Sequence, residues 1–425
     1  MNDNLTELQS IIEEMNYLHE ITQSISENKP LDKLLTEIME SCKILMKAEA
    51  STLMIYDEKE DILMFEVATG DKGDILKLIK IHMGEGIAGW VAKNREPLLI
   101  EDCYSDPRFN PEFDKKTRFV TKSMICVPMI HKEKLIGILQ VINKKDGKVF
   151  TERDLNLFRN LASQCAISIE NAKLIKVQIQ QEAINRELRT AREIQQNLLP
   201  SVLPEFKDIQ VSAKLIPAKQ VGGDYYNIYK IDDDSTLFFI CDVSGKSISA
   251  ALIVSTIYSA VVTYFELNKK SFRLLEFVHC LNRVLIESTT SEKFATAWFG
   301  LYNHKSRVMQ SVNAGHNSTY VFKADGSLTE LLAGGMFLGC ADLEYKSEEI
   351  SLGSGNVLFY FTDGVNEAMN SEMQQFGDEN LISAIRNNLN HETTEILEKV
   401  LEAVKGFVRE AEQSDDITCG VIKIL

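Results

Sequence analysis

Four places in the C-terminal half of the chain put an aspartate beside a glycine or at the mouth of an apolar run. They are Asp224, Asp242, Asp363 and the pair Asp415 and Asp416. Carboxylate oxygens are the ligands that hard cations such as Mg²⁺ and Mn²⁺ prefer. Two such ions can lower the pKa of a shared water and hold it for in-line attack on a phosphoryl group. The spacing therefore indicates phosphoryl hydrolysis, and the alternative is that each aspartate only caps a turn.

The elements around these aspartates indicate how they could meet. Asp242 and Asp363 each end an apolar, strand-like run, and Asp415 and Asp416 precede the last such run at 418–424. Strand patterns also cover 209–216, 294–302, 308–314 and 319–323, and helical patterns cover 249–266, 271–287 and much of 379–411. Aspartates at strand mouths can converge on one end of a sheet sandwich, so we expect the carboxylates to lie together.

The N-terminal half has a different organisation. Helical periodicity at 5–28 ends before Pro30, and a second helical segment at 31–47 precedes strand patterns at 50–56, 62–68, 98–100, 123–129 and 135–143. A single helical pattern without Gly or Pro then runs from 154 to 199. Its apolar seam has Gln181 and Gln195 at two core positions, which predicts a coiled-coil linker able to adopt two arrangements.

Composition limits the class of partner. The 425 residues carry a net charge of −16, which argues against nucleic acid as the main partner. We see no signal peptide, and the apolar stretch 250–265 is too short and too often interrupted by Ser and Thr for a membrane span. The eight cysteines are widely spaced without a C-x-x-C pair, which favours free thiols in a reducing cytoplasm. We therefore expect a cytoplasmic chain.

Five motifs over about residues 190–425 resemble the PP2C-like phosphatases of the SpoIIE/RsbU type. In chain order they are Val221-Gly222-Gly223-Asp224-Tyr225-Tyr226, Asp242-Val243-Ser244-Gly245-Lys246, Asn313-Ala314-Gly315-His316-Asn317, Tyr360-Phe361-Thr362-Asp363-Gly364, and Asp415-Asp416-Ile417-Thr418. The resemblance implies an α/β/β/α sandwich that hydrolyses phosphoserine or phosphothreonine with two divalent cations, Mn²⁺ or Mg²⁺.

The same resemblance implies a role for each ligand. Asp242 would bridge both ions, Asp363 and Asp415 would complete one site, and Asp224 with the backbone carbonyl of Val243 would serve the other. Asp416 would be a supporting or turn residue. His316 could be a general acid, although its motif is more typical of a loop-shaping element, and Lys246 could face the phosphate or solvent. Asn227 departs from the family pattern, which has Asp there.

Residues 30–172 resemble a GAF domain, an antiparallel sheet with helices. The residues that carry this resemblance are Gly84-Glu85-Gly86-Ile87-Ala88-Gly89-Trp90, Ser123-Met124-Ile125-Cys126-Val127-Pro128 and Ile136-Gly137-Ile138-Leu139-Gln140-Val141-Ile142-Asn143-Lys144. Asn143-Lys144, Phe150 and Asp154 also match part of a motif of cyclic-nucleotide-binding GAF domains, with Leu155 in place of the usual Glu. The motif can instead be structural, tying a strand end to a helix start, so a small-molecule ligand is left open.

We therefore expect α/β and α+β domains in the order N-terminal helix (1–29), GAF sensor (30–172), helical coiled-coil linker (165–200) and PP2C-like phosphatase (201–425). The expected function is that of a GAF-regulated, metal-dependent serine/threonine phosphatase, and the expected assembly is a homodimer. The resemblance implies that its substrate is a STAS-domain anti-anti-sigma factor in bacterial partner switching. The alternative is a non-catalytic regulator that senses a ligand or recruits a partner.

Overall fold

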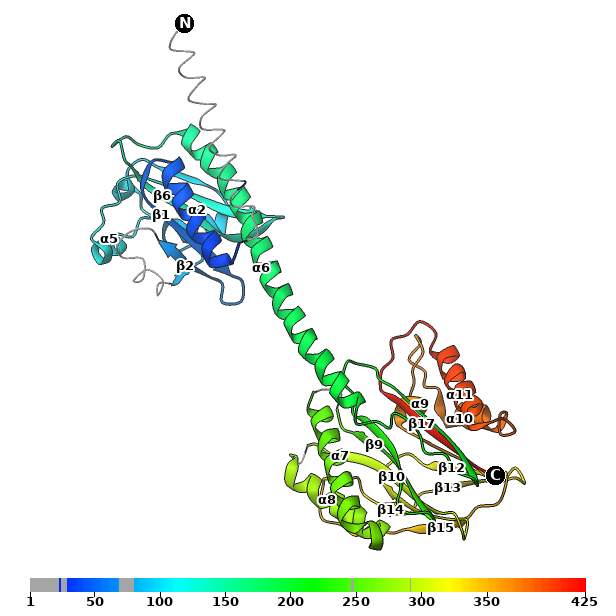
Figure 1. Ribbon diagram of the computed structural model, residues 1–425. Helices are drawn as coiled ribbons and strands as arrows, with labels where there is room; N and C mark the ends of the chain where they lie inside the picture. Colours follow the sequence, from blue (N-terminus) through cyan, green and yellow to red (C-terminus); the bar gives the residue numbers. More distant parts are fainter. Residues whose placement is uncertain (1–22, 24–28, 69–79, 246–247, 291) are drawn as a thin grey trace. The chain divides into compact units, whose positions relative to one another are not determined.

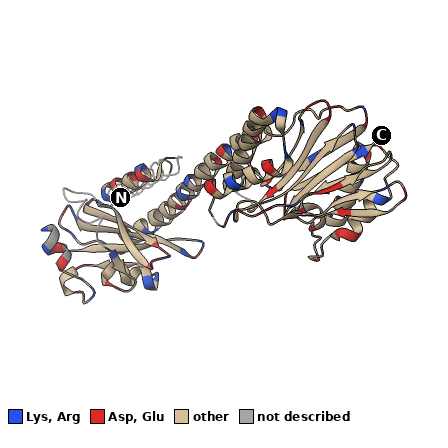
Figure 2. Cartoon of the chain, turned by 90° about the horizontal axis from the view of Figure 1, so that it is seen from below, with Lys and Arg blue, Asp and Glu red and all other residues tan. Residues whose placement is uncertain are grey.

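The computed structural model describes residues 23, 29–68, 80–245, 248–290 and 292–425 (Figure 1). The predicted helix at 5–28 lies almost entirely outside these residues. The chain divides into two compact units, Met1–Ala183 and Ile184–Leu425. Charged residues lie mainly on helices and turns, while the strands are mostly uncharged (Figure 2).

The first unit is built on one antiparallel sheet of six strands in the order β3-β2-β1-β6-β5-β4. The strands are β1 (Ala48–Asp57), β2 (Ile62–Ala68), β3 (Lys80–His82), β4 (Leu98–Ile100), β5 (Met124–His131) and β6 (Lys134–Lys144). The helical segments are α2 (Leu31–Leu45), α4 (Gly86–Asn94), η1 (Cys103–Ser105), α5 (Glu112–Thr117) and the start of α6 (Glu152–Gln196). One face of the sheet packs against α2 and α6, and the other against α4. The expected GAF-like fold is confirmed.

Helix α6 begins with a reciprocal cap. The Thr151 hydroxyl accepts a hydrogen bond from the Asp154 N–H (3.3 Å), and the Asp154 carboxylate accepts from the Thr151 N–H (2.8 Å). The residues of this helix that are buried all lie between Leu155 and Ile169. Beyond them the helix continues with exposed apolar side chains, so only its first part belongs to the first unit's core.

The second unit is a sandwich of two sheets. One has the order β14-β11-β10-β9-β8, with β15 paired to β11, and the other has the order β13-β12-β16-β17-β7. The strands are β7 (Ile209–Ile216), β8 (Asp224–Lys230), β9 (Ser235–Val243), β10 (Ala295–Asn303), β11 (Val308–Ala314), β12 (Thr319–Phe322), β13 (Leu328–Leu331), β14 (Gly334–Gly335), β15 (Glu348–Ser351), β16 (Val357–Phe361) and β17 (Ile417–Ile424).

Helices cover the outer faces of the sandwich. Helices α7 (Ile248–Asn268) and α8 (Leu274–Ser288), joined by η2 (Lys269–Ser271), pack on the first sheet. Helices α10 (Gly377–Arg386) and α11 (Thr393–Val408) pack on the second, with the short α9 (Asp363–Asn366) at its edge. Figure 1 shows these helix pairs on opposite sides of the sheets. The arrangement is the expected α/β/β/α sandwich.

The inner faces of the two sheets form one core. Trp298 of β10 stacks on Tyr360 of β16 across the sandwich, with ring centroids 5.4 Å apart. Gly420 of β17 lies under that tyrosine, and a Cβ there would come 2.0 Å from the ring. Close packing in this layer fixes the position of one sheet relative to the other, and hence of the strand ends that carry the aspartates.

Helix α7 and the turn after it, Ile248–Ser271, form the one described helical stretch whose length and hydropathy would suit a membrane span. One face of α7 packs in the core beside the first sheet through Val254, Ile257 and Val261. One face of α7 is therefore part of the core of the second unit, although the helical stretch is longer than the apolar run at 250–265 on which the sequence prediction rested.

Candidate metal centre

The first pair of predicted ligands lies on adjacent strands. Asp224 begins β8 and is the register partner of Asp242, which lies near the end of β9. Register partners in an antiparallel pair have their side chains on the same face of the sheet. The N–H of Val243 donates to the carbonyl of Gly223 (3.1 Å), and a Cβ on Gly223 would lie 2.6 Å from the Val243 carbonyl oxygen. Glycine is therefore needed for Val243 to come this close.

The second pair comes from the other sheet. Asp363 begins α9 directly after β16, and Asp415 lies two residues before β17. The ends of these strands are joined by a hydrogen bond from the Thr362 N–H to the Thr418 carbonyl (2.9 Å). A Cβ on Gly364 would lie 1.9 Å from the Asp416 carbonyl oxygen and 3.3 Å from the Asp415 Cβ. The absence of a side chain at Gly364 thus lets the two acidic segments meet.

The acids of the two sheets lie close enough to affect one another. The pKa of Asp242 is raised to about 7 by its burial and then by the negative charges of Asp363, Asp415 and Asp416. The pKa of Asp224 is held well above its ordinary value by burial and by the charge of Asp242. Four chain segments therefore bring five carboxyl groups to one place.

Asp224 is held differently from the other acids. Its Oδ2 accepts hydrogen bonds from the hydroxyls of Thr362 (2.8 Å) and Thr418, which belong to the other sheet. Among the described residues, no three Asp, Glu, His or Cys side chains are placed closely enough to hold a metal ion as they stand. The centre thus offers hard oxygen donors with mutual repulsion, which suits a divalent cation, but the ion would have to draw these donors together.

Asp416 makes backbone contacts that its position in a motif did not reveal. Its two carboxylate oxygens accept from the backbone N–H groups of Ala218 and Gly223, each at 2.8 Å. A Cβ on Gly222 would lie 2.2 Å from its Oδ2. Asp416 therefore anchors the loop before Asp224, which accords with the expected supporting role.

A residue of the linker helix reaches the same loop. The side-chain amide of Gln195 donates to the carbonyl of Gly222 (2.7 Å) and accepts from the N–H of Gly222 (3.1 Å). The amide predicted to lie in a coiled-coil seam therefore contacts Gly222 of the second unit, two residues before Asp224. Gln181 lies exposed on the same helix.

The His316 loop is a structural element beside the acids. His316 is nine-tenths buried, its Nδ1 lies 2.8 Å from the Thr296 hydroxyl, and burial lowers its pKa to about 4. Asn313 closes the loop by accepting from the His316 N–H (2.7 Å) and donating to the His316 carbonyl (3.0 Å). The imidazole is therefore neutral near pH 7, which favours the loop-shaping interpretation over a general acid.

Two further sequence expectations concern neighbours of the site. Asn227, where the family has Asp, is buried and donates to the hydroxyls of Tyr225 (2.9 Å) and Tyr229 (3.1 Å). Its contacts are those of a core residue. Lys246 lies outside the described residues, so its predicted alternatives stay predictions.

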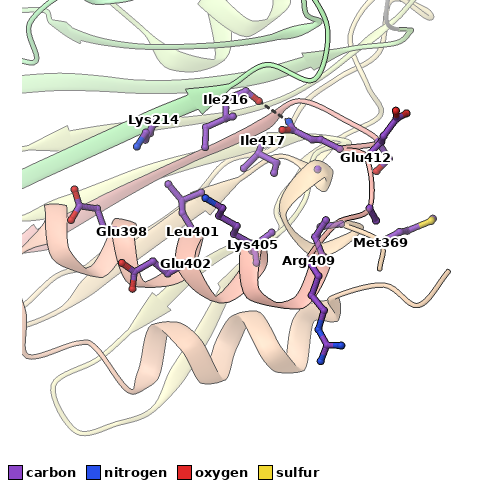
Figure 3. Close-up of a pocket in the computed structure, with 17 residues that line it drawn as sticks. Lys214, Ile216, Met369, Glu398, Leu401, Glu402, Lys405, Arg409, Glu412 and Ile417 are labelled. Carbon is purple, nitrogen blue, oxygen red and sulfur yellow. Dashed lines mark hydrogen bonds between the residues drawn. The ribbon is translucent and has the colours of Figure 1, made fainter. Parts of the chain in front are cut away.

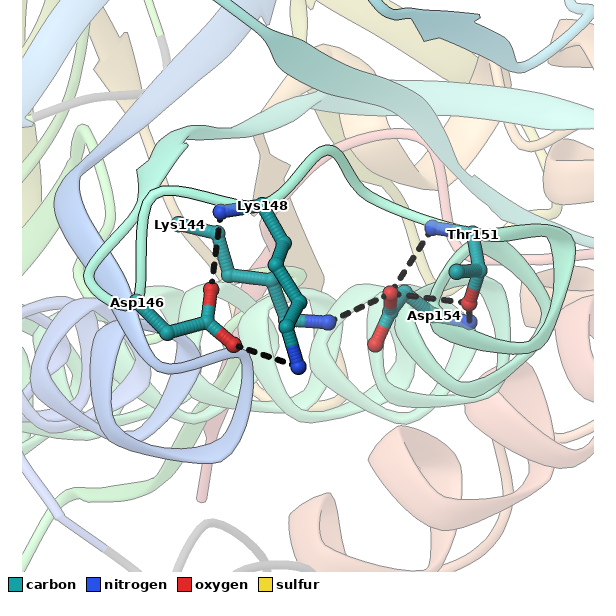
Figure 4. Close-up of polar contacts among 5 residues, drawn as sticks. All are labelled: Lys144, Asp146, Lys148, Thr151 and Asp154. Carbon is teal, nitrogen blue, oxygen red and sulfur yellow. Dashed lines mark hydrogen bonds and ion pairs between the residues drawn. The ribbon is translucent and has the colours of Figure 1, made fainter.

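The partial cyclic-nucleotide motif of the first unit forms internal contacts. Lys144 at the end of β6 pairs with Asp154 at the start of α6 (2.8 Å), and Figure 4 shows Thr151 on the same carboxylate. The Asn143 side chain accepts from the Lys122 N–H (2.7 Å) and donates to the Val120 carbonyl (2.8 Å). The motif therefore ties a strand end to a helix start, as its structural interpretation predicted.

The two units correspond to two known families of domain. Residues 232–425 match the family model described as Stage II sporulation protein E (SpoIIE), and residues 30–169 match the GAF domain model. Residues 232–425 thus form a SpoIIE-type domain, and residues 30–169 form a GAF domain.

Two individual relatives each match a part of the chain. The chain is 34% identical over 191 residues to the phosphoserine phosphatase RsbU of Bacillus subtilis, covering 44% of this chain and 56% of that protein. It is 34% identical over 169 residues to the probable 3',5'-cyclic phosphodiesterase pde-5 of Caenorhabditis elegans, covering 37% of this chain and 23% of that protein. The chain thus spans about half or less of these relatives.

A solved structure supports the fold of the second unit. The SiaA-PP2C domain of Pseudomonas aeruginosa superimposes with a TM-score of 0.51 at 21% identity, covering 58% of this chain and 98% of that chain. This likeness concerns the fold alone.

The Gln195 contact generates a prediction for metal affinity. Gln195→Leu removes both hydrogen bonds to Gly222 and loosens the loop that ends in Asp224. We expect the Mn²⁺ concentration for half-maximal phosphatase activity to rise by up to roughly 100-fold, because two lost backbone partners are worth about 1–3 kcal/mol. Gln196→Leu, at the exposed neighbouring position, is the matched control and should leave the Mn²⁺ concentration for half-maximal activity unchanged. An unaltered Mn²⁺ titration in Gln195→Leu would show that the contact does not support the centre.

The raised pKa of Asp242 generates a second prediction. Because the folded chain holds this proton more tightly than the unfolded chain, the stabilisation is full below pH about 4 and is lost as the pH rises through about 7. In chelator, the melting temperature of the second unit should therefore fall between about pH 4 and pH 7, the range set by the unfolded and folded pKa values of Asp242. Calorimetry at a series of pH values measures the melting temperature, and Asp242→Asn should make that temperature depend less on pH. An equal slope in that variant would contradict the assignment.

Proposed function

We propose that this chain is a metal-dependent phosphatase for phosphoserine or phosphothreonine in proteins, regulated by its GAF domain. The observation that carries the proposal is the meeting of Asp224, Asp242, Asp363 and Asp415 from two sheets, where burial and then the neighbouring negative charges raise the pKa of Asp242. A cation would relieve this repulsion. The SpoIIE family match and the printed name of the Bacillus relative, a phosphoserine phosphatase, support the reaction class.

The proposed roles follow the sequence expectation. Asp242 would bridge two divalent cations, Mn²⁺ or Mg²⁺, with Asp363 and Asp415 completing one site, and Asp224 with the Val243 carbonyl completing the other. When bound, such ions supply a water of lowered pKa and polarise the phosphoryl oxygens. The hydroxyls of Thr362 and Thr418 orient the Asp224 carboxylate between the sheets.

The proposed setting also follows from the family. We propose a cytoplasmic protein whose substrate is a phosphorylated STAS-domain anti-anti-sigma factor. The GAF domain would bind a small molecule or serve only as a dimerised scaffold. The internal contacts of Lys144 and Asp154 leave cyclic nucleotide recognition without support from that motif.

Helix α6 offers a surface for the proposed homodimer. Leu174, Val177 and Ile184 lie on one face and are 60%, 62% and 51% exposed. Apolar side chains that repeat every three or four residues on a long exposed helix are typical of a coiled-coil seam. Burial of this face against a second copy would remove it from water.

Metal dependence is tested with p-nitrophenyl phosphate and a phosphoserine peptide as substrates. Hydrolysis of both should require Mn²⁺ or Mg²⁺ and stop in chelator. Asp242→Asn should lower turnover by at least about 100-fold, since the same residue would serve both ions. Asp325→Asn is the matched control, because Asp325 caps an exposed turn by accepting from Ser327. Full turnover in Asp242→Asn, or in chelator, would contradict the mechanism and favour a non-catalytic recruiting module.

The dimer is tested by light scattering at micromolar concentration. Leu174→Glu with Val177→Glu should convert the dimer to a monomer, because charges within a seam lose their hydration. Ile179→Glu is the control, since Ile179 is equally exposed (61%) but lies on the opposite face of the helix. A wild-type monomer, or equal effects of the two changes, would rule out this seam.

A further inference from the structure

A cavity of about 590 Å³ opens beside the metal centre on the outer side of the second sheet (Figure 3). Its walls come from β7, the C-terminal half of α11, the start of β17 and the segment 409–414. We call it the α11 groove. It lies within the second unit, so both its walls and the acidic centre belong to one compact body.

The floor of the α11 groove is apolar. Ile216 of β7, Leu401 and Val404 of α11, and Ile417 of β17 contribute to it. Ile216 and Leu401 are partly exposed, although both belong to the apolar layer between the sheet and α11. Covering such a surface with an apolar side chain of a partner removes both from water and lowers the free energy.

Two lysines give the groove its chemical preference. Lys214 and Lys405 line it from opposite walls, and Figure 3 shows Lys405 extending past Leu401 toward Ile216. Neither amine forms an ion pair with a described residue. The lining also includes Arg409 and the three glutamates Glu398, Glu402 and Glu412, of which Glu402 is paired with Lys399 (3.0 Å). An anionic group in the groove would therefore meet two ammonium groups that have no competing partner among the described residues.

The groove is continuous with the metal centre. Its lining includes Gly364 and Ser414, the neighbours of Asp363 and Asp415. Gln413, which also lines it, donates to the carbonyls of Ile216 (2.9 Å) and Asp415 (2.7 Å). The segment 413–415 thus lines the groove and also carries Asp415 of the acidic centre. A polypeptide bound at the centre would therefore have the groove beside it.

We propose that the α11 groove docks a segment of the phosphoprotein substrate in which apolar and acidic side chains lie next to each other near the phosphorylated residue. This inference rests on the proposed phosphatase function. The apolar floor selects the first kind of side chain, Lys214 and Lys405 select the second, and continuity with Asp363 and Asp415 places both near the phosphoryl group. Such docking lowers KM for the right protein without taking part in the chemistry.

The test compares two phosphoserine peptides of equal length, one with Leu and Glu on both flanks and the other with Gly and Ser. With Mn²⁺ and the full chain, we expect kcat/KM to be about tenfold higher for the Leu/Glu peptide, mainly through KM. The double variant Lys214→Glu/Lys405→Glu should lose this preference and keep its turnover of p-nitrophenyl phosphate. Lys269→Glu/Lys270→Glu, on exposed lysines of the opposite helical layer, should retain the preference.

Several outcomes would overturn the inference. Equal kcat/KM for the two peptides with wild type would do so, as would a preference that survives the double charge reversal. A change of oligomeric state in the double variant, seen by light scattering, would instead make the groove a contact between copies. If wild type hydrolyses neither p-nitrophenyl phosphate nor peptide, the proposed function fails, and fluorescence anisotropy of the labelled peptides then decides separately whether the groove selects the Leu/Glu flank.

Discussion

The second unit depends on holding several acidic side chains close together where the strand ends of its two sheets meet. Carboxyl groups that share a partly buried site repel one another and lose hydration, so the surrounding structure must hold them there. Rigid strand register and the stacked Trp298 and Tyr360 fix the sheets. Gly223 and Gly364 allow the acidic segments to approach within distances that a side chain would prevent. The fold thus stores an electrostatic cost that a cation would relieve.

The loop before Asp224 is held from two directions. Asp416 binds it from the second sheet through Gly223, and Gln195 binds it from the end of α6 through Gly222. The same helix, at its other end, contributes Phe158 and Ile169 to the core of the GAF domain. A continuous helix therefore carries residues of the GAF-domain core and a residue that contacts the loop before Asp224, which is a covalent and hydrogen-bonded route that the proposed regulation would use.

The sequence allowed much of this architecture to be predicted, and the exceptions have physical causes. The long helix, the two domain types and most strands were expected from periodicity and motif. Strand β8 was not expected, because both of its faces are buried: Tyr225 packs toward α7 and Tyr226 toward the second sheet, which removes the polar alternation. The contacts of Gln195 and Asp416 were not predictable, since each binds the backbone of a glycine loop, and backbone partners leave no pattern in residue types. The metal-ligand roles remain predictions.

Because α6 is continuous, the number of residues in it constrains how the N-terminal domain could be exchanged for another. Each residue inserted into a helix turns everything beyond it by about 100° and moves it 1.5 Å along the axis. Between Val177 and Ile184, an inserted residue therefore turns the apolar positions on its two sides onto different faces of the helix. A different N-terminal domain would keep this apolar face continuous only if it were joined in the same helical phase. Fusions that differ by a heptad would preserve that phase almost unchanged, whereas those that differ by two residues would place Leu174 and Val177 on the face opposite Ile184.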